Sequence, residues 1–345
     1  MLVRPHTLSL ITTHQCTAAC DHCCFNCTPK IIDAIPINRL HSLIDEANEI
    51  ESIQVIVFTG GECFLLGDDL YDLIAHAKQN GLLTRCVTNG YWGTEKNVDG
   101  VVKSLVAAGL DEINFSTGEE HGTYVPPDRV RTAALACNNA GIRVLINIEL
   151  FNDTSFNAIS FIESDGLCAA VESKTIKVQR NVWIKGDGAR ELEHQRTHSR
   201  FNPDRIGGCH TALNVLAVTP KQSLVACCGL HMERIPELHL GSIENESLLS
   251  LVRRVPDDFL KIWIHVEGPE RILQFVKAKR PDFRLPEESV HPCTTCLHLY
   301  KNEEAREVIA EYYTEAESRI SNLYLAGLTK DELERSMRDL SFGDS

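Results

Sequence analysis

Five cysteines lie within twelve positions near the start of the chain, in the segment QCTAACDHCCFNCTPK (residues 15–30). Cys16, Cys20 and Cys23 have the spacing C-x3-C-x2-C. Three thiolates from one short loop can hold three irons of a cubane iron–sulfur cluster and leave the fourth iron open, whereas electron-transfer sites close all four positions with protein ligands. Structural zinc usually takes two closely spaced cysteine pairs. The spacing therefore favours an iron–sulfur cluster whose open iron can bind a substrate.

The other cysteines fall into three groups. Cys24 and Cys27 follow the triad and either pack beneath its loop or face a substrate channel; packing is the simpler expectation. A second set of five occurs much later in the chain, and four more stand alone in apolar segments, where we expect small core residues: Cys63, Cys86, Cys137 and Cys168. A cytosolic thiol pool keeps cysteines reduced, so the 14 cysteines favour metal binding over a disulfide framework.

Short β-branched runs alternate with amphipathic segments over the first half of the chain. This alternation predicts right-handed βαβ units and a parallel sheet, and six units are two short of a full barrel. We predict an α/β fold, a partial (β/α)6 TIM-like barrel. Its expected strands are 7–13, 53–60, 82–90, 112–118, 142–150 and 175–180, and its expected helices are 37–50, 67–80, 96–109, 127–140 and 155–165.

A second region follows a polar stretch after about residue 185. The segments LNVLAV and SLVACC, separated by TPKQ, predict a β-hairpin. The chain ends in an acidic segment rich in helix formers. We therefore divide the chain into a barrel (1–190), a cysteine-containing domain (191–300) and a C-terminal helical tail (301–345).

Composition excludes several classes of protein. The formal charge of −14 argues against a nucleic-acid binder, which needs a clustered basic face. Since no run of about 18 apolar residues occurs and the N-terminus lacks a signal-peptide pattern, we expect a cytoplasmic protein without a membrane partner.

The C-x3-C-x2-C loop after the first strand of a partial barrel resembles the radical SAM superfamily. Residues 59–62, TGGE, end the second strand and strengthen the resemblance. It implies a [4Fe-4S] cluster on Cys16, Cys20 and Cys23 with bound S-adenosylmethionine (AdoMet). It also implies cofactor-binding roles for six residues: His22 near adenine, Gly60, Gly61 and Glu62 at the methionine ammonium, and Ser116 and Asn147 at ribose or the carboxylate. The segment GDGAR (186–190) resembles the family's loop over adenine.

The later cysteines resemble the SPASM/Twitch extensions of radical SAM enzymes, although Gln222 stands where that motif has glycine. Five cysteines cannot fill two four-thiolate sites, so the resemblance implies one auxiliary [4Fe-4S] cluster. Its ligands would be Cys209, Cys293, Cys296 and one of Cys227 or Cys228. Adjacent residues of a strand face opposite sides, which leaves one thiol over. We take Cys227 as the ligand and Cys228 as the free thiol; the reverse stays open, as does a zinc ribbon.

An auxiliary cluster implies a peptide substrate, and the triad segment resembles radical SAM maturases of ribosomally made peptides, particularly peptide epimerases. The implied reaction forms a 5′-deoxyadenosyl radical, removes hydrogen from Cα of a precursor peptide and returns hydrogen from a thiol of Cys228 or Cys227. A reducing partner such as flavodoxin or ferredoxin is implied too. The alternatives are thioether or carbon–carbon crosslinking of the peptide, and a zinc-binding module without enzymatic activity. Because the chain begins at the first strand, we expect any leader recognition to use the barrel, the C-terminal helices or a separate protein.

Overall fold

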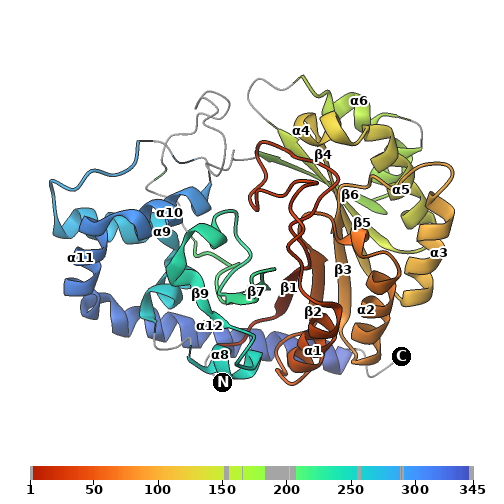
Figure 1. Cartoon of the computed structure of the whole chain (residues 1–345). Helices are drawn as coiled ribbons and strands as arrows, with labels where there is room; N and C mark the ends of the chain where they lie inside the picture. Colours follow the sequence, from red (N-terminus) through yellow and green to blue (C-terminus); the bar gives the residue numbers. More distant parts are fainter. Residues whose placement is uncertain are drawn as a thin grey trace.

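The computed structural model describes residues 3–150, 155–164, 166–182, 202, 207–254, 258–287, 289 and 291–341. Six parallel strands form the N-terminal half and pair in chain order, with each strand beside the next. They are β1 (Thr7–Ile11), β2 (Val55–Thr59), β3 (Leu83–Thr88), β4 (Glu112–Gly118), β5 (Arg143–Leu150) and β6 (Ile176–Val182). Figure 1 shows them as the curved sheet on the right of the molecule. The predicted partial barrel is confirmed.

Helices connect these strands and cover the outer face of the sheet (Figure 1). The longer ones are α1 (Ile37–Asn48), α2 (Asp68–Gln79), α3 (Val98–Ala108) and α5 (Pro127–Asn139). Each presents apolar residues at helical spacing to the sheet, such as Leu40, Leu43, Ile44 and Ala47 of α1. Helix α3 ends at Gly109, whose φ of 83° is the left-handed conformation typical of a helix C-cap.

Three short helices differ from the prediction: two replace one longer expected helix, and the third lies where no helix was expected. The expected helix at 155–165 is instead two helices, α6 (Ala158–Ile162) and α7 (Leu167–Glu172), and Gly166 with φ of 77° precedes the second. Helix α4 (Glu119–Tyr124) follows β4 directly and was not predicted. Its sequence, EEHGTY, has no apolar stripe and runs into two prolines, so periodicity gives no signal for it. A 3-10 turn, η1 (Cys63–Leu66), follows β2.

The second region continues the barrel sheet. Strand β7 (Val215–Val218) pairs in parallel with β1, and β8 (Ser223–Val225) and β9 (His239–Ser242) add to it antiparallel, giving the order β6-β5-β4-β3-β2-β1-β7-β8-β9. The predicted hairpin is confirmed, while β9 was missed because its sequence, HLGS, is short and contains glycine. Gln222 has φ of 56° in the hairpin turn. It therefore adopts the left-handed backbone that a glycine would supply there without strain.

Five helices complete the chain on the left and lower sides of Figure 1: α8 (Leu248–Arg254), α9 (Phe259–Lys279), α10 (Pro292–Lys301), α11 (Glu303–Tyr312) and α12 (Thr314–Ser341). Helix α9 is broken at Gly268, which has non-helical angles and precedes Pro269. Its fully buried Trp263 packs edge-on against Phe275, with ring centroids 5.0 Å apart. Helix α12 returns to α9 through an ion pair between Arg319 and Glu267. The predicted terminal helices are confirmed.

The predicted domain limits stay predictions. The boundary at 190 falls among residues 183–201, which lie outside the described part of the chain, as does the GDGAR segment. The boundary at 300 falls in the last turn of α10. In the described residues, no helix combines the length and the apolar character that crossing a membrane requires.

Strand β1 has neighbours on both sides and is buried at all five positions. Truncating its fully buried Leu10 leaves a cavity that this packing cannot fill. We expect Leu10→Ala to lower the free energy of unfolding by about 2–5 kcal/mol, measured by anaerobic denaturant titration. The matched change Ile32→Ala, at a side chain 78% exposed, should alter it by less than about 0.5 kcal/mol. Equal losses for the two variants would contradict the described packing.

Candidate active site

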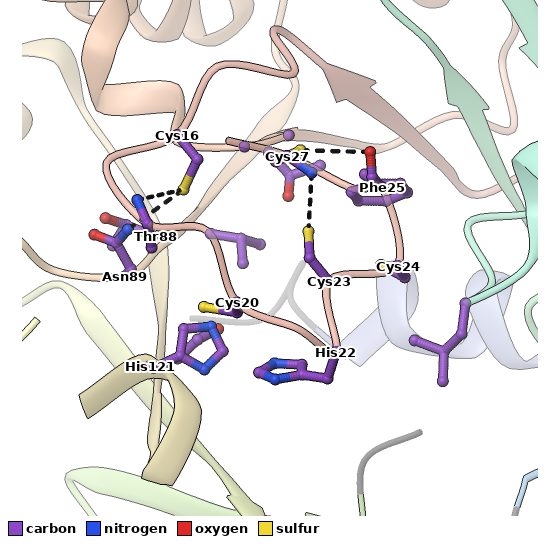
Figure 2. Close-up of a pocket in the computed structure, with 17 residues that line it drawn as sticks. Cys16, Cys20, His22, Cys23, Cys24, Phe25, Cys27, Thr88, Asn89 and His121 are labelled. Carbon is purple, nitrogen blue, oxygen red and sulfur yellow. Dashed lines mark hydrogen bonds between the residues drawn. The ribbon is translucent and has the colours of Figure 1, made fainter. Parts of the chain in front are cut away.

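The loop between β1 and α1 covers a cavity of about 210 Å³ at the carboxyl ends of the strands. Cys16, Cys20 and Cys23 all line this cavity, as do Cys24 and Cys27. Figure 2 shows the loop folded around it, with the triad cysteines on three sides. Residues from the ends of three neighbouring strands close the wall: Thr59, Gly60, Gly61, Val87, Thr88, Asn89 and Ser116. The structure thus brings together cysteines that sequence spacing had selected.

Hydrogen-bond donors point at two of the triad sulfurs. The backbone N–H of Cys27 donates to Cys23 Sγ at 3.3 Å, and the N–H of Ala18 donates to Cys16 Sγ at 3.4 Å. Asn89 Nδ2 lies 3.6 Å from Cys16 Sγ (Figure 2). It also donates to Thr17 Oγ1 at 2.9 Å. Such N–H···S bonds stabilise thiolates and tune the potential of iron–sulfur clusters. Three converging sulfurs with donors already in place therefore fit the implied cluster.

The cysteine loop packs directly on Gly60 and Gly61. The N–H of Gly61 donates to the carbonyl of Thr13 at 2.7 Å, and the N–H of Glu62 donates to the carbonyl of Gln15 at 2.9 Å. A Cβ at position 61 would lie 2.1 Å from the Gln15 oxygen, and one at position 60 would lie 2.5 Å from the Thr13 oxygen. Both glycines also line the cavity. They are needed for the approach of the cysteine loop as well as for any approach of a ligand.

Glu62 lies on the far side of this contact and does not line the cavity. Its fully buried carboxylate accepts hydrogen bonds from Thr88 Oγ1 at 2.9 and 3.0 Å, from the N–H of Asn89 at 2.9 Å and from the N–H of Phe64 at 3.1 Å. Burial raises the pKa of Glu62 to about 7, although these donors oppose the shift. The observed contacts join the ends of β2 and β3, which differs from the expected contact with an ammonium group.

His22 lines the cavity and is 2% exposed. Its Nε2 lies 2.9 Å from Glu149 Oε2, which also accepts from Nδ1 of His121 at 2.5 Å. His121 lines the cavity too, beside His22 and Cys20 (Figure 2). Of the two residues predicted near ribose or carboxylate, Ser116 lines the cavity, whereas Asn147 is half-buried outside the lining.

The later cysteines gather around a separate cavity of about 40 Å³, which is lined by Cys209, Cys227, Cys293 and Cys296. The N–H of Cys209 donates to the carbonyl of Ile264 in α9 at 3.0 Å. Cys293 and Cys296 lie on the first turns of α10, where His291 caps the helix by accepting from the Cys293 N–H. Burial raises the pKa of Cys293 to about 12 and also raises the pKa of Cys227 and of Cys296, so these three thiols favour ionisation only beside a cation.

Cys228 is outside the lining of this second cavity and faces the barrel. It forms a side-chain hydrogen bond with Ser9 of β1 and interacts electrostatically with Cys24 of the triad loop. Leu230, two residues further on, lines the first cavity together with Cys24. The adjacent thiols of Cys227 and Cys228 thus have different surroundings: Cys227 lines the second cavity, whereas Cys228 lines neither cavity and contacts Ser9 of β1. Both residues follow β8, which ends at Val225.

The remaining cysteines follow expectation with two differences. Cys63, Cys86 and Cys137 are fully buried core residues, as predicted. The prediction that Cys168 is a core residue is wrong, because Cys168 is half-buried on the short helix α7 beside Glu172. Cys24 and Cys27 line the first cavity in addition to packing beneath the loop.

Sequence reasoning missed Asn89, His121 and Glu149. A signal was available for each: Asn89 belongs to an Asn-Gly turn at the end of β3, and His121 follows the end of β4 by three residues. Glu149 is a carboxylate between Ile148 and Leu150 at the end of β5. Polar residues at carboxyl strand ends are where parallel α/β folds build active sites.

A three-cysteine loop over a parallel partial barrel, with a glycine pair beneath it, is the arrangement that the resemblance to radical SAM enzymes predicts. The family model described as Radical SAM superfamily matches residues 10–154. The match covers less than half of the chain, and over these residues, which include most of the barrel, the chain is similar to the radical SAM superfamily.

Relatives are found over different shares of the chain. YydG of Bacillus subtilis (strain 168), named as a peptide biosynthesis protein, is 22% identical over 303 residues, which cover 86% of this chain and 93% of that protein. The PqqA peptide cyclase of Xanthomonas campestris pv. campestris (strain B100) is 33% identical over 155 residues, which cover 41% of this chain and 39% of the cyclase. The second match is thus confined to less than half of either protein.

Solved structures share the fold at low sequence identity. Native anSMEcpe with bound AdoMet has a TM-score of 0.57 and 13% identity, with coverage of 93% of this chain and 100% of that one. SuiB of Streptococcus suis, bound to the precursor peptide SuiA, has a TM-score of 0.50 and 14% identity, with coverage of 72% and 65%. The first of these extends the likeness beyond the barrel to nearly the whole chain.

The raised pKa of Glu62 predicts a pH dependence of stability. Its ordinary value is 4.5 and its folded value about 7, so between these pH values the folded chain keeps a proton that the unfolded chain has released. The contribution of Glu62 is therefore full below about pH 4.5 and is lost as the pH rises through 7.

We expect Glu62→Gln to remove up to about 3 kcal/mol of the decrease in unfolding free energy between pH 5 and pH 8, measured by denaturant titration of the anaerobic holoenzyme. The exposed control Glu49→Gln should keep the wild-type decrease. An unchanged pH dependence in Glu62→Gln would show that this carboxyl titrates at its ordinary pKa.

Proposed function

We propose that the protein is a radical SAM peptide epimerase, which inverts Cα of a residue in a ribosomally made precursor peptide. The substrate class is supported by the names of two relatives, a peptide biosynthesis protein and a peptide cyclase, and by the precursor peptide bound in the SuiB structure. The observation that carries the reaction type is the separation of Cys228 from its neighbour Cys227. One thiol of the pair remains on the barrel side, where a substrate radical would form.

Cys16, Cys20 and Cys23 would hold the cluster, and the cavity beside them would hold AdoMet. The backbone oxygens of Gly60 and Gly61, which line the cavity, are better placed for the methionine ammonium than Glu62, because the Glu62 carboxylate already accepts hydrogen bonds from three donors and does not line the cavity. Ser116 remains a candidate for ribose or carboxylate contact. When bound, the cluster and AdoMet supply the 5′-deoxyadenosyl radical that removes a hydrogen atom.

The chain's own part in the reaction is to complete the inversion. After Cα loses its hydrogen, the planar carbon radical accepts a hydrogen atom from the Cys228 S–H on the opposite face. The S–H bond breaks, a Cα–H bond forms, and Cys228 is left as a thiyl radical. One electron from a flavodoxin- or ferredoxin-class carrier and one proton from solvent restore the thiol.

The second cavity supports a single auxiliary [4Fe-4S] cluster on Cys209, Cys227, Cys293 and Cys296. The four thiols line one space, and burial raises the pKa of Cys227, Cys293 and Cys296, which opposes the ionisation of these three unless a cation is bound. The same donor set suits zinc, so the two are separated by metal analysis. Anaerobically purified protein should contain about eight irons per chain with two clusters, and about four irons with one zinc if the site is a zinc site.

The donor role of Cys228 is tested with a precursor peptide in D2O. Because a thiol exchanges with solvent, each inverted residue of the wild-type product should gain one deuterium at Cα, detected by mass spectrometry and chiral amino-acid analysis. Cys228→Ser keeps the size and the hydrogen-bonding capacity toward Ser9, but an O–H bond is too strong to donate its hydrogen atom. We expect this variant to form 5′-deoxyadenosine while losing epimer at least tenfold.

Cys168→Ala is the control, since Cys168 is a thiol on α7 that lines neither cavity, and it should keep epimer formation. If Cys228→Ala and Cys227→Ala both still give deuterated epimer, the thiol hypothesis is wrong. A product two hydrogens lighter than the peptide would instead identify crosslinking, and a colourless, iron-free protein would identify the zinc-binding alternative.

A further inference from the structure

Glu149 is buried at the end of β5, behind the wall of the first cavity, and it gathers three donors on one carboxylate. Its Oε1 accepts from the backbone N–H of His121 at 2.8 Å. Its Oε2 accepts from two imidazoles, Nδ1 of His121 at 2.5 Å and Nε2 of His22 at 2.9 Å. The side chain is 2% exposed and does not line the cavity, whereas both imidazoles do. Glu149 therefore contacts the cavity through the two rings.

The fold makes room for this carboxylate at a specific place. Glu149 pairs with Gly118 of β4, and a Cβ at position 118 would lie 2.1 Å from Glu149 Cγ. Gly118 has φ of 144° and immediately precedes α4, which carries His121. The glycine thus permits both the turn into α4 and the burial of Glu149 beneath it.

The contacts fix the orientation of both rings. Since an ionised carboxylate only accepts, the hydrogen lies on Nε2 of His22 and on Nδ1 of His121. The ring centroids are 5.0 Å apart with planes tilted by 58°, so neither ring can rotate without losing its bond or striking the other. This arrangement leaves Nε2 of His121 and Nδ1 of His22 outside the Glu149 contacts, on two rings that both line the cavity.

Helix α4 is tied to the cysteine loop at a second point. The hydroxyl of Tyr124 donates to the carbonyl of Ala19, between the first and second triad cysteines, at 2.8 Å. His22 itself lies between the second and third. The Glu149 contacts therefore join β5, α4 and the cysteine loop where AdoMet and the cluster would meet.

We propose that Glu149 is a positioning residue for AdoMet, holding His22 and His121 in fixed orientations, and that His121 contacts the cofactor through Nε2. The proposal rests on the radical SAM assignment and not on the epimerase reaction. A carboxylate that only secured the start of α4 would need one oxygen for the His121 N–H. The second oxygen instead serves the two rings, both of which face the cavity.

AdoMet binding to the reduced, reconstituted holoenzyme tests the proposal, because AdoMet changes the electron paramagnetic resonance spectrum of a cluster that it ligates. In Glu149→Gln one carboxylate oxygen becomes an NH2 group, which faces either the backbone N–H of His121 or the two imidazole N–H groups, so a contact that holds His121 is lost in either orientation. We expect wild-type iron content and the wild-type spectrum without AdoMet, but at least a tenfold higher AdoMet concentration at half-saturation.

The matched control is Glu119→Gln, which changes a carboxylate of the same helix that bonds Ser155 on the outer side. It should bind AdoMet as the wild type does. His121→Gln should weaken AdoMet binding by a similar factor to Glu149→Gln. The AdoMet concentration at half-saturation of the double variant should lie within about threefold of that of the weaker-binding single variant, because one residue acts through the other.

Three outcomes would overturn the proposal. The first is an AdoMet affinity equal to that of the wild type in Glu149→Gln or His121→Gln protein that keeps its full iron content. If Glu149→Gln fails to fold, the result for His121→Gln decides. The second is multiplication of the two single effects in the double variant. The third is one equivalent of a non-iron divalent metal in the wild type that Glu149→Gln lacks, since the three side chains would then be metal ligands. The absence of epimerase activity in a protein that still binds AdoMet would count against the proposed function and would leave the positioning role of Glu149 standing.

Discussion

The contact between the cysteine loop and the Gly60–Gly61 pair is the constraint on which the site depends. Two backbone hydrogen bonds hold Thr13 and Gln15 against the end of β2, at distances that leave no space for a Cβ. Glu62, the next residue, then binds the end of β3 with its buried carboxylate. A short motif therefore fixes the loop that carries the three sulfurs and also joins two neighbouring strands, because its backbone and its acidic side chain act on opposite sides.

The same sheet links the two cysteine sites. Strand β1 leads into the triad loop and pairs with β2 on one side and β7 on the other, so the later hairpin is an extension of the barrel sheet. Cys227 and Cys228 follow that hairpin; Cys227 lines the second cavity, and Cys228 contacts Ser9 of β1. A thiol next to an auxiliary site is thereby held close to the place where substrate chemistry is proposed, without any flexible connection.

Sequence patterns predicted the six parallel strands, the main helices and the hairpin because each has apolar periodicity of its own. They also selected the triad, since its spacing is local. They could not give the partners of Glu62: GGE is a local pattern, but Thr88 and Asn89 reach it through folding. Glu149 and His121 were missed for a related reason. They are 28 residues apart and meet only because β4 and β5 pair in register, which one sequence does not reveal. Helix α4, without an apolar stripe, gave no periodic signal.

The central claim is that Cys16, Cys20 and Cys23 hold a cluster with an open iron for AdoMet. The most direct measurement compares the wild type with a variant in which all three are alanine, by iron analysis and by 5′-deoxyadenosine formation from AdoMet under a strong reductant. The account predicts that the variant loses about four irons per chain, keeps any iron bound by the later cysteines and forms no 5′-deoxyadenosine. Full iron content, or 5′-deoxyadenosine at the wild-type rate, in the triple variant would contradict it.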